Sequence, residues 1–358
     1  MSDPSPVSGT DLKRHGLRYS SDTEPGIRRR RRGKGFTYTD AAGNRITDTS
    51  EIARCNALAV PPAYRDVWIC ADPRGHLQAT GRDARGRKQY RYHPRWHAVR
   101  GEAKYHRILE FAEQLPALRR RVSYDLGKPG LPPEKVVAAI VRLLEGSLIR
   151  IGNTEYSRDN ESYGLTTLRD EHVEVDGAEI HFEFVGKGGK DWKLDVKDPR
   201  VARVVAACQD LPGQHLFQYV DADGTRHSIG SAEVNAYLHD HTGDDFTAKD
   251  FRTWAATVMA YHALCAAPEA TTKKERQSHL KAAVAQVAGR LRNTQAICRK
   301  AYVHPAVITH WEAGALAAAC ASARDDADRA PEGLRKEEKQ VWVFLKEAEE
   351  KAATQAAQ

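Results

Sequence analysis

The sequence predicts an α+β protein: a small, mainly β N-terminal domain and a larger, mostly α-helical domain with a three-stranded β-hairpin region. Short alternating segments separated by turn residues fill residues 33–98, which is typical of β-strands. Leu, Ile and Val recur at helical spacing from about residue 103 onward. A length of 358 residues with 41% apolar side chains is sufficient for two compact domains.

The first 32 residues are polar and end in a run of five arginines, residues 28–32. We predict a disordered basic arm over residues 1–32. It is either a solvated tail or an arm that lies along phosphates, and we favour the second interpretation. Like charges at this density repel one another unless an anion screens them.

Residues 33–98 are predicted to form the small domain, with a short helix capped by Asp48 or Ser50. The turn residues at 72–75 indicate a hairpin. Strands are expected at residues 36–39, 67–70, 76–79 and 89–92.

Residues 99–320 form the predicted larger domain, followed by a charged helical tail at 321–358. Asp176-Gly177 is a strong hairpin turn, and the chain from Gly186 to Lys190 turns into a further strand. Beyond residue 199 we expect almost only helices. The predicted helices span residues 103–123, 133–146, 199–209, 231–240, 247–265, 269–288, 305–318 and 334–352.

The net charge is +7, which favours a polyanionic partner without requiring one. The six cysteines show no metal-ligand spacing, so we expect reduced thiols. No apolar run reaches the length of a membrane span, and the polar N-terminus differs from a secretion signal. We therefore expect a cytoplasmic protein without membrane contact.

Several short segments stand out when they are read together. Arg150 precedes Tyr163-Gly164, Lys187 lies in a glycine-rich turn, and Asn293 precedes Tyr302 by nine residues. The remaining segments are Lys249-x-x-Arg252 and Gly86-Arg87-Lys88-Gln89-Tyr90. In this order and spacing, the chain resembles the type IB DNA topoisomerases of the poxvirus-like and bacterial branch from about residue 33 to 318.

The resemblance implies a role for each matching residue. Tyr302 would be the nucleophile, Arg150 and Arg252 would bind the scissile phosphate, and Lys187 would be the general acid. Asn293 stands where many relatives have a phosphate-binding histidine, and Lys249 would be a secondary phosphate contact. The implied DNA-binding residues of the small domain are Arg82, Arg87, Lys88, Gln89, Tyr90 and Tyr92.

Elementary chemistry agrees with these roles. Attack on a phosphodiester builds negative charge on the non-bridging oxygens, and fixed guanidinium groups stabilise that charge. The DNA alkoxide is a poor leaving group and needs a proton donor. A phosphotyrosyl bond conserves the energy of the broken linkage. We therefore expect no metal, no ATP and no small-molecule cofactor.

The resemblance implies that a monomer clamps double-stranded DNA, associates with the nucleoid and relaxes supercoils through a 3′-phosphotyrosyl intermediate. One alternative is a tyrosine site-specific recombinase, although such enzymes usually carry His-x-x-Arg where this chain has Lys249-x-x-Arg252. The other is a non-enzymatic, architectural DNA-binding protein. Each singled-out residue also has a structural interpretation, such as packing for Tyr302, and only their joint occurrence favours function.

Overall fold

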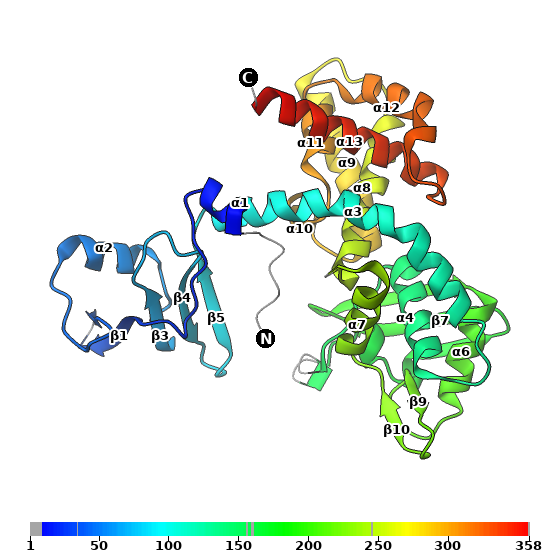
Figure 1. The fold of residues 1–358 in the computed structure, drawn as a ribbon, viewed down its shortest axis with the longest axis horizontal. Helices are drawn as coiled ribbons and strands as arrows, with labels where there is room; N and C mark the ends of the chain where they lie inside the picture. The colour runs from blue at the N-terminus through cyan, green and yellow to red at the C-terminus, as the bar shows by residue number, and fades with distance from the viewer. Residues whose placement is uncertain (1–8, 34, 155–156, 159–160, 245, 357–358) are drawn as a thin grey trace. The chain divides into compact units, whose positions relative to one another are not determined.

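The structure is a computed structural model that describes residues 9–33, 35–154, 157–158, 161–244 and 246–356. The chain divides into two compact units, Met1–His106 and Arg107–Gln358 (Figure 1). Helix α3 (Trp96–Asp125) runs across this division, and the predicted boundary at 98/99 falls inside the same helix. The predicted α+β class is confirmed, with a β-rich first unit and a mainly helical second unit.

Unit 1 is built on an antiparallel five-stranded sheet of order β2-β1-β3-β4-β5. The strands are β1 (Gly26–Arg32), β2 (Gly35–Thr39), β3 (Arg65–Cys70), β4 (Leu77–Arg82) and β5 (Lys88–Tyr92). Helix α2 (Thr49–Ala57) packs on one face through Cys55, which joins a core with Ile27 and Ile69. Asp48 caps α2 by accepting from the Ser50 N–H at 2.8 Å, as predicted.

The prediction of a disordered arm is wrong for residues 9–32, while residues 1–8 lie outside the described residues. The chain forms helix α1 (Gly9–Arg14), and the arginine run lies in strand β1. β1 pairs with β2 over residues 28–32 and with β3 over residues 26–28. Charge repulsion between neighbouring arginines is reduced because successive side chains of a strand point to opposite faces.

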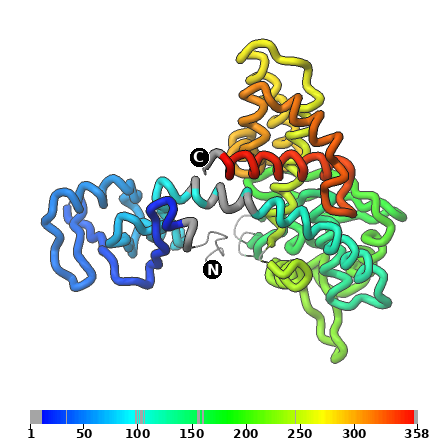
Figure 2. The backbone as a smooth tube through the Cα atoms, turned by 45° about the horizontal axis from the view of Figure 1, so that its top comes forward, coloured from blue at the N-terminus to red at the C-terminus, as the bar shows by residue number. Residues whose placement is uncertain are grey.

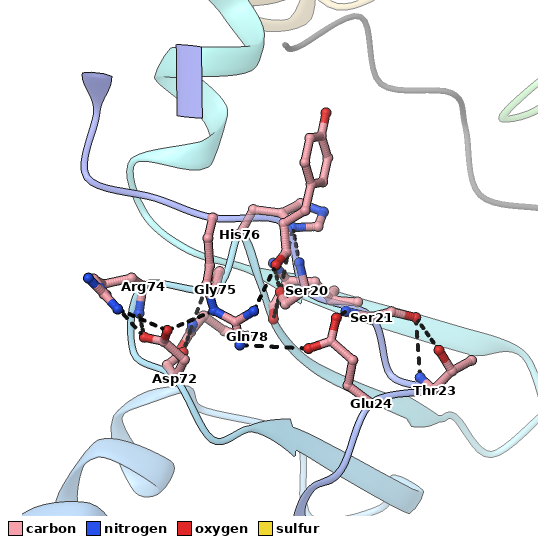
Figure 3. Close-up of polar contacts among 12 residues, drawn as sticks. Ser20, Ser21, Thr23, Glu24, Asp72, Arg74, Gly75, His76 and Gln78 are labelled. Carbon is pink, nitrogen blue, oxygen red and sulfur yellow. Dashed lines mark hydrogen bonds and ion pairs between the residues drawn. The ribbon is translucent and has the colours of Figure 1, made fainter. Parts of the chain in front are cut away.

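An ion pair and hydrogen bonds join residues 18–24 to the turn between β3 and β4 and to the start of β4 (Figure 3). The Arg18 guanidinium forms an ion pair with Asp72 at 2.7 Å. The Ser20 hydroxyl donates to the Leu77 carbonyl at 2.9 Å and accepts from the Leu77 N–H at 3.1 Å. The Gln78 amide, also drawn in Figure 3, donates to the Gly75 carbonyl at 2.8 Å. The bonds of Arg18 and Ser20 hold a segment without regular structure against the sheet, and the Gln78 bond lies within the β3–β4 hairpin itself.

Unit 2 is centred on the buried helix α4, which packs against α6, α7 and α8. The C-terminal helix α13, red in Figure 2, packs on α8 and α12. The helices are α4 (Pro133–Ser147), α6 (Pro199–Gln209), α7 (Ser231–Thr242), α8 (Ala248–Cys265), α9 (Lys273–Leu291), α10 (Gln295–Ala301), α11 (Pro305–Glu312), α12 (Leu316–Asp325) and α13 (Lys336–Ala356).

The predicted hairpin region is a three-stranded antiparallel sheet of order β6-β7-β8. Its strands are β6 (Val173–Asp176), β7 (Glu179–Gly186) and β8 (Lys190–Lys197). Ile180, Phe182 and Phe184 alternate along β7 and are buried in the core of unit 2. This alternation fixes the register, because a shift by one residue would expose all three side chains.

Unit 2 departs from the sequence predictions in several places. A small hairpin of β9 (Gln218–Val220) and β10 (Arg226–Ser228) interrupts the region expected to be almost entirely helical. The predicted helix at 305–318 is split into α11 and α12 near Gly314, whose φ is +74°. Helix α10 was not predicted. Cys265 and Cys320 form a disulfide with a Cα–Cα distance of 6.2 Å, so the expectation of six reduced cysteines is wrong for this pair.

The predicted C-terminal tail is helical, and it is also part of the core. Val341, Phe344 and Leu345 of α13 are buried among residues of unit 2. Across the described ranges of the chain, none of the helices has both the length and the hydropathy needed to cross a bilayer.

A buried ion-pair network joins α13 to the rest of unit 2. The Arg119 guanidinium donates to both oxygens of Glu338, at 2.6 and 2.8 Å, and to Glu145 at 2.9 Å. Burial alone would raise the pKa of Glu338, but Arg119 and Arg335 outweigh it and lower that pKa below its ordinary value. The stabilisation from this shift is complete above the ordinary pKa and is lost as the pH falls through the folded-state value.

Replacing Glu338 with alanine leaves the buried Arg119 guanidinium without its bidentate partner. We expect the free energy of unfolding to fall by about 3 kcal/mol or more, as when one partner of a buried ion pair is removed. Urea denaturation followed by circular dichroism measures the change. The exposed neighbour Glu337→Ala is the matched control and should stay within about 0.5 kcal/mol of the unsubstituted protein. Equal losses for the two variants would contradict a role of the network.

Candidate active site

Tyr302 lies at the C-terminal end of α10, where its N–H donates to the Cys298 carbonyl at 3.0 Å. The chain on both sides of Tyr302 is tied to α8 by the buried side chain of Thr257. The Thr257 hydroxyl donates to the Tyr302 carbonyl at 3.2 Å and accepts from the His304 N–H at 3.2 Å. The backbone that carries the half-buried phenol is therefore held against the helix that also carries Arg252. Sequence reasoning missed Thr257, since a threonine in an apolar helix gives no functional signal.

Arg252 is 2% exposed and lies in the first turns of α8. Its guanidinium donates to the carbonyl of Leu291 at 2.8 Å and to the carbonyl of Leu148. The guanidinium carbon lies 5.4 Å from the centre of the Tyr302 ring. Burial and the nearby charge of Arg150 lower the pKa of Arg252 to about 10, which still leaves it protonated at neutral pH.

Arg150 is positioned by a close approach of two backbone segments. The Leu165 N–H donates to the Arg150 carbonyl at 2.9 Å. A Cβ on Gly164 would lie 2.6 Å from the Arg150 carbonyl oxygen and 2.6 Å from the Gly152 nitrogen, so only glycine fits there. Gly152 itself has a φ of +100°, a conformation that side chains rarely adopt. These two glycines therefore fix the path of the chain that presents Arg150.

Asn293 lies beside Arg150, because the Arg150 guanidinium donates to the Asn293 side-chain oxygen. The residue before it, Arg292, ends α9 in the left-handed conformation with a φ of +49°. The Asn293 N–H then donates to the Ala288 carbonyl at 3.0 Å. The end of α9 thus turns the amide toward Arg150.

The site holds buried N–H groups that have no acceptor. They are Nη1 of Arg150, Nε of Arg252 and Nδ2 of Asn293, which lack a hydrogen-bond partner among the described residues. An unsatisfied buried donor costs about 1–3 kcal/mol, and an acceptor on a bound ligand would remove that cost. Two guanidinium groups and an amide with open donors form a site suited to an anion with several oxygens.

The charges of this site act on the Tyr302 phenol. Burial alone would raise the pKa of Tyr302, but Arg252, Arg150 and Lys249 together lower it below its ordinary value. Lys249 is exposed in the first turn of α8, so the predicted secondary residue does lie close enough to influence the phenol. A lowered pKa makes the phenolate easier to form and therefore makes Tyr302 a better nucleophile.

Lys187 occupies the turn between β7 and β8, where Gly188 and Gly189 have φ angles of +76° and +68°. The end of β7 is joined to the segment that supports Arg150, because the Tyr163 N–H donates to the Val185 carbonyl at 2.9 Å. The side chain of Lys187 is exposed. Its placement at a phosphate stays a prediction.

The DNA-binding residues predicted in unit 1 lie on the hairpin of β4 and β5. Tyr90 is 42% exposed and stacks on Tyr92 with a centroid distance of 6.2 Å. The basic members are partnered by acids in the structure: Lys88 with Asp22 at 2.5 Å, Arg87 with Asp83 at 2.9 Å and Arg82 with Asp66 at 4.0 Å. The Gln89 amide donates to Asp83 at 3.0 Å. Contact of these residues with DNA stays a prediction.

Comparison with known proteins finds two matching families. Residues 93–323 match the family described as eukaryotic DNA topoisomerase I, catalytic core, and residues 35–83 match bacterial DNA topoisomerase IB, N-terminal domain. The DNA topoisomerase 1B of Acanthamoeba polyphaga mimivirus is 31% identical over 285 residues, which cover 78% of this chain and 85% of the viral protein. The DNA topoisomerase 1B of vaccinia virus (strain Copenhagen) is 30% identical over 127 residues, 35% of this chain and 39% of that protein.

Removing the charge of Lys249 should raise the pKa of Tyr302, because one of the cations that favour the phenolate is lost. In the variant Lys249→Gln we expect the phenol to titrate at a higher pH than in the unsubstituted protein. An ultraviolet absorbance titration measures this, as the difference between each protein and the same protein carrying Tyr302→Phe. Lys274→Gln, an exposed change on α9, is the control and should leave the titration unchanged. An unchanged or lower pKa in Lys249→Gln would contradict the electrostatic account.

Proposed function

Because the chain belongs to the type IB DNA topoisomerase family, we propose that it relaxes supercoiled DNA through a transient bond between Tyr302 and a DNA 3′-phosphate. The observation that carries this proposal is the convergence of Arg150, Arg252 and Asn293 beside the phenol. Their open N–H groups are suited to the non-bridging oxygens of a phosphodiester.

In the proposed cleavage step, the Tyr302 oxygen attacks phosphorus and the bond from phosphorus to the 5′-oxygen breaks. The phenol gives its proton to solvent water, and the leaving 5′-oxygen receives one from the Lys187 ammonium group. Arg150 and Arg252 stabilise the charge that develops on the non-bridging oxygens, and the Asn293 amide adds a neutral donor. Lys249 contributes a positive charge from the edge of the site.

Religation is the reverse reaction. The free 5′-hydroxyl attacks the phosphotyrosyl linkage, its proton returns to Lys187, and the phenolate leaves. A phenolate is a better leaving group than a sugar alkoxide, so the energy of the original linkage is kept and no ATP is needed. Between the two steps, torsional strain rotates the free end about the intact strand. Supercoils of either sign are therefore removed.

The cationic side chains supply the charge stabilisation that metal ions supply in other phosphoryl-transfer sites. The reaction is accordingly proposed to proceed without a metal or cofactor. We further propose that the protein acts on double-stranded DNA as a cytoplasmic monomer.

Tyr302→Phe keeps the ring and its packing but removes the oxygen that would bond to phosphorus. We expect this variant to bind DNA and to lose both the covalent adduct and relaxation. Supercoiled plasmid in EDTA without ATP, quenched with detergent, measures relaxation, and mass spectrometry identifies the modified residue.

The matched control is Tyr261→Phe. Tyr261 is a buried residue of α8, and its hydroxyl has no hydrogen-bond partner among the described residues. This variant should retain relaxation. Relaxation by Tyr302→Phe would overturn the assignment of the nucleophile. Strict dependence on magnesium would point to a different enzyme class.

Lys187→Ala should slow cleavage by roughly 10²–10⁴-fold, the usual contribution of a positioned general acid. A substrate with sulfur in place of the scissile 5′-oxygen tests the role directly, because a thiolate leaves without a proton. On this substrate we expect Lys187→Ala to cleave at nearly the rate of the unsubstituted protein, measured by single-turnover adduct formation.

Lys190→Ala removes the other lysine next to the same turn and serves as the control. Both substrates should be cleaved by this variant at nearly normal rates. If Lys187→Ala remained slow on the sulfur substrate, the lysine would have a role other than proton donation.

A further inference from the structure

The arginine run of β1 is divided by the two faces of the sheet. On the face covered by α2, the Arg29 guanidinium donates to the carbonyls of Val60 and Pro61 at 2.7 and 2.9 Å, and it lies 4.1 Å from the centre of the Phe36 ring. Arg29 is therefore a structural residue. Arg31 shares its face, because side chains two apart in a strand point the same way.

Arg28, Arg30 and Arg32 lie on the opposite face, and all three are exposed. Their neighbours across the pairing with β2 are Thr39, Thr37 and Gly35. These neighbours are short or lack a side chain, whereas Arg29 and Arg31 pair with Tyr38 and Phe36. Strand β2 thus places aromatic side chains beside Arg29 and Arg31 on one face. On the other face it leaves the guanidinium groups of the three alternate arginines uncovered.

Of the three arginines in this row, Arg28 lies near the carboxylates of Asp22 and Asp66, which line a common hollow with it. Within the part of the chain that the structure describes, no carboxylate forms an ion pair with Arg28, Arg30 or Arg32. The basic residues of the β4–β5 hairpin differ in this respect, since Arg87 and Lys88 are paired with Asp83 and Asp22. Positive charge available to a partner is therefore present on β1.

The row lies on the same sheet as the β4–β5 hairpin that was predicted to contact DNA, and β3 lies between them. Arg28 lines a hollow of the sheet together with Thr80, Arg82 and Lys88, and the acids Asp22 and Asp66 line it too. Backbone pairing also connects them, since Arg28 pairs with Trp68, Trp68 with Thr80, and Thr80 with Tyr90. A ligand that reaches this hollow could continue along β1.

We infer that Arg28, Arg30 and Arg32 form a phosphate-binding face that holds the backbone of the DNA substrate. Side chains on one face of a strand repeat about every 6.6 Å, which is close to the separation of neighbouring phosphates along one DNA strand. Each guanidinium can donate two hydrogen bonds to one phosphate. The inference rests on the proposed function, because that function supplies DNA as the partner.

The test measures the affinity of a fluorescent DNA duplex over a series of salt concentrations, in full-length protein carrying Tyr302→Phe so that no cleavage occurs. We expect Arg30→Ala with Arg32→Ala to reduce the slope of log affinity against log salt by about 1.8, because each lost phosphate contact removes about 0.9. Arg30→Gln with Arg32→Gln should give the same reduction.

Arg31→Ala is the matched control, since it removes one exposed arginine from the other face of the same strand. Its slope should be unchanged. An equal effect per arginine in Arg31→Ala would overturn the inference, because only bulk charge would then matter. An unchanged slope in both double variants would also overturn it.

The proposed function is tested separately, by measuring plasmid relaxation and adduct formation in protein that retains Tyr302. If that protein relaxes plasmid while the double variants keep their slope, only the inference fails. If it neither relaxes plasmid nor forms an adduct, the proposed function fails, and a reduced slope would still support a phosphate-binding face.

Discussion

The buried guanidinium of Arg252 is the interaction on which the site depends. It donates to the carbonyl of Leu148, just past the end of α4, and to that of Leu291, the last residue of α9. The ends of two helices, whose carbonyls carry partial negative charge, are thereby held on a third helix by one cation. Arg150 follows the first of these carbonyls and Asn293 the second by two residues each. The hydrogen bonds from Arg252 to these two carbonyls therefore also bring Arg150 and Asn293 together.

This arrangement concentrates positive charge where little water can screen it. The pKa of Arg252 falls to about 10 through burial and the nearby charge of Arg150. The phenol of Tyr302 also has a lowered pKa, since cations favour its deprotonated form. An anion bound to the open donors of the site would relieve the repulsion between the arginines. The site is therefore suited electrostatically to an anion with several oxygens.

Unit 1 uses arginine in two physically different ways. Arg29 is a packing residue that satisfies carbonyls of the loop after α2. The alternate arginines of β1 make no such bonds and retain their charge at the surface. Asp83 and Asp22 form ion pairs with Arg87 and Lys88, for which the resemblance implied a role in DNA binding. Composition alone does not distinguish these uses, because the residue type is the same and only its face differs.

The sequence alone determined the fold class, most helices and the β6–β7–β8 hairpin, because hydrophobic periodicity and turn residues act locally. It also named Tyr302, Arg150 and Arg252 through a resemblance, and their roles remain predictions. The tertiary structure decided that the arginine run is a strand, because pairing with β2 and with the distant β3 outweighs the local charge repulsion. It likewise decided the place of α13 in the core and the anchoring of Tyr302 by Thr257. Such contacts join residues far apart in the chain, and no local pattern encodes them.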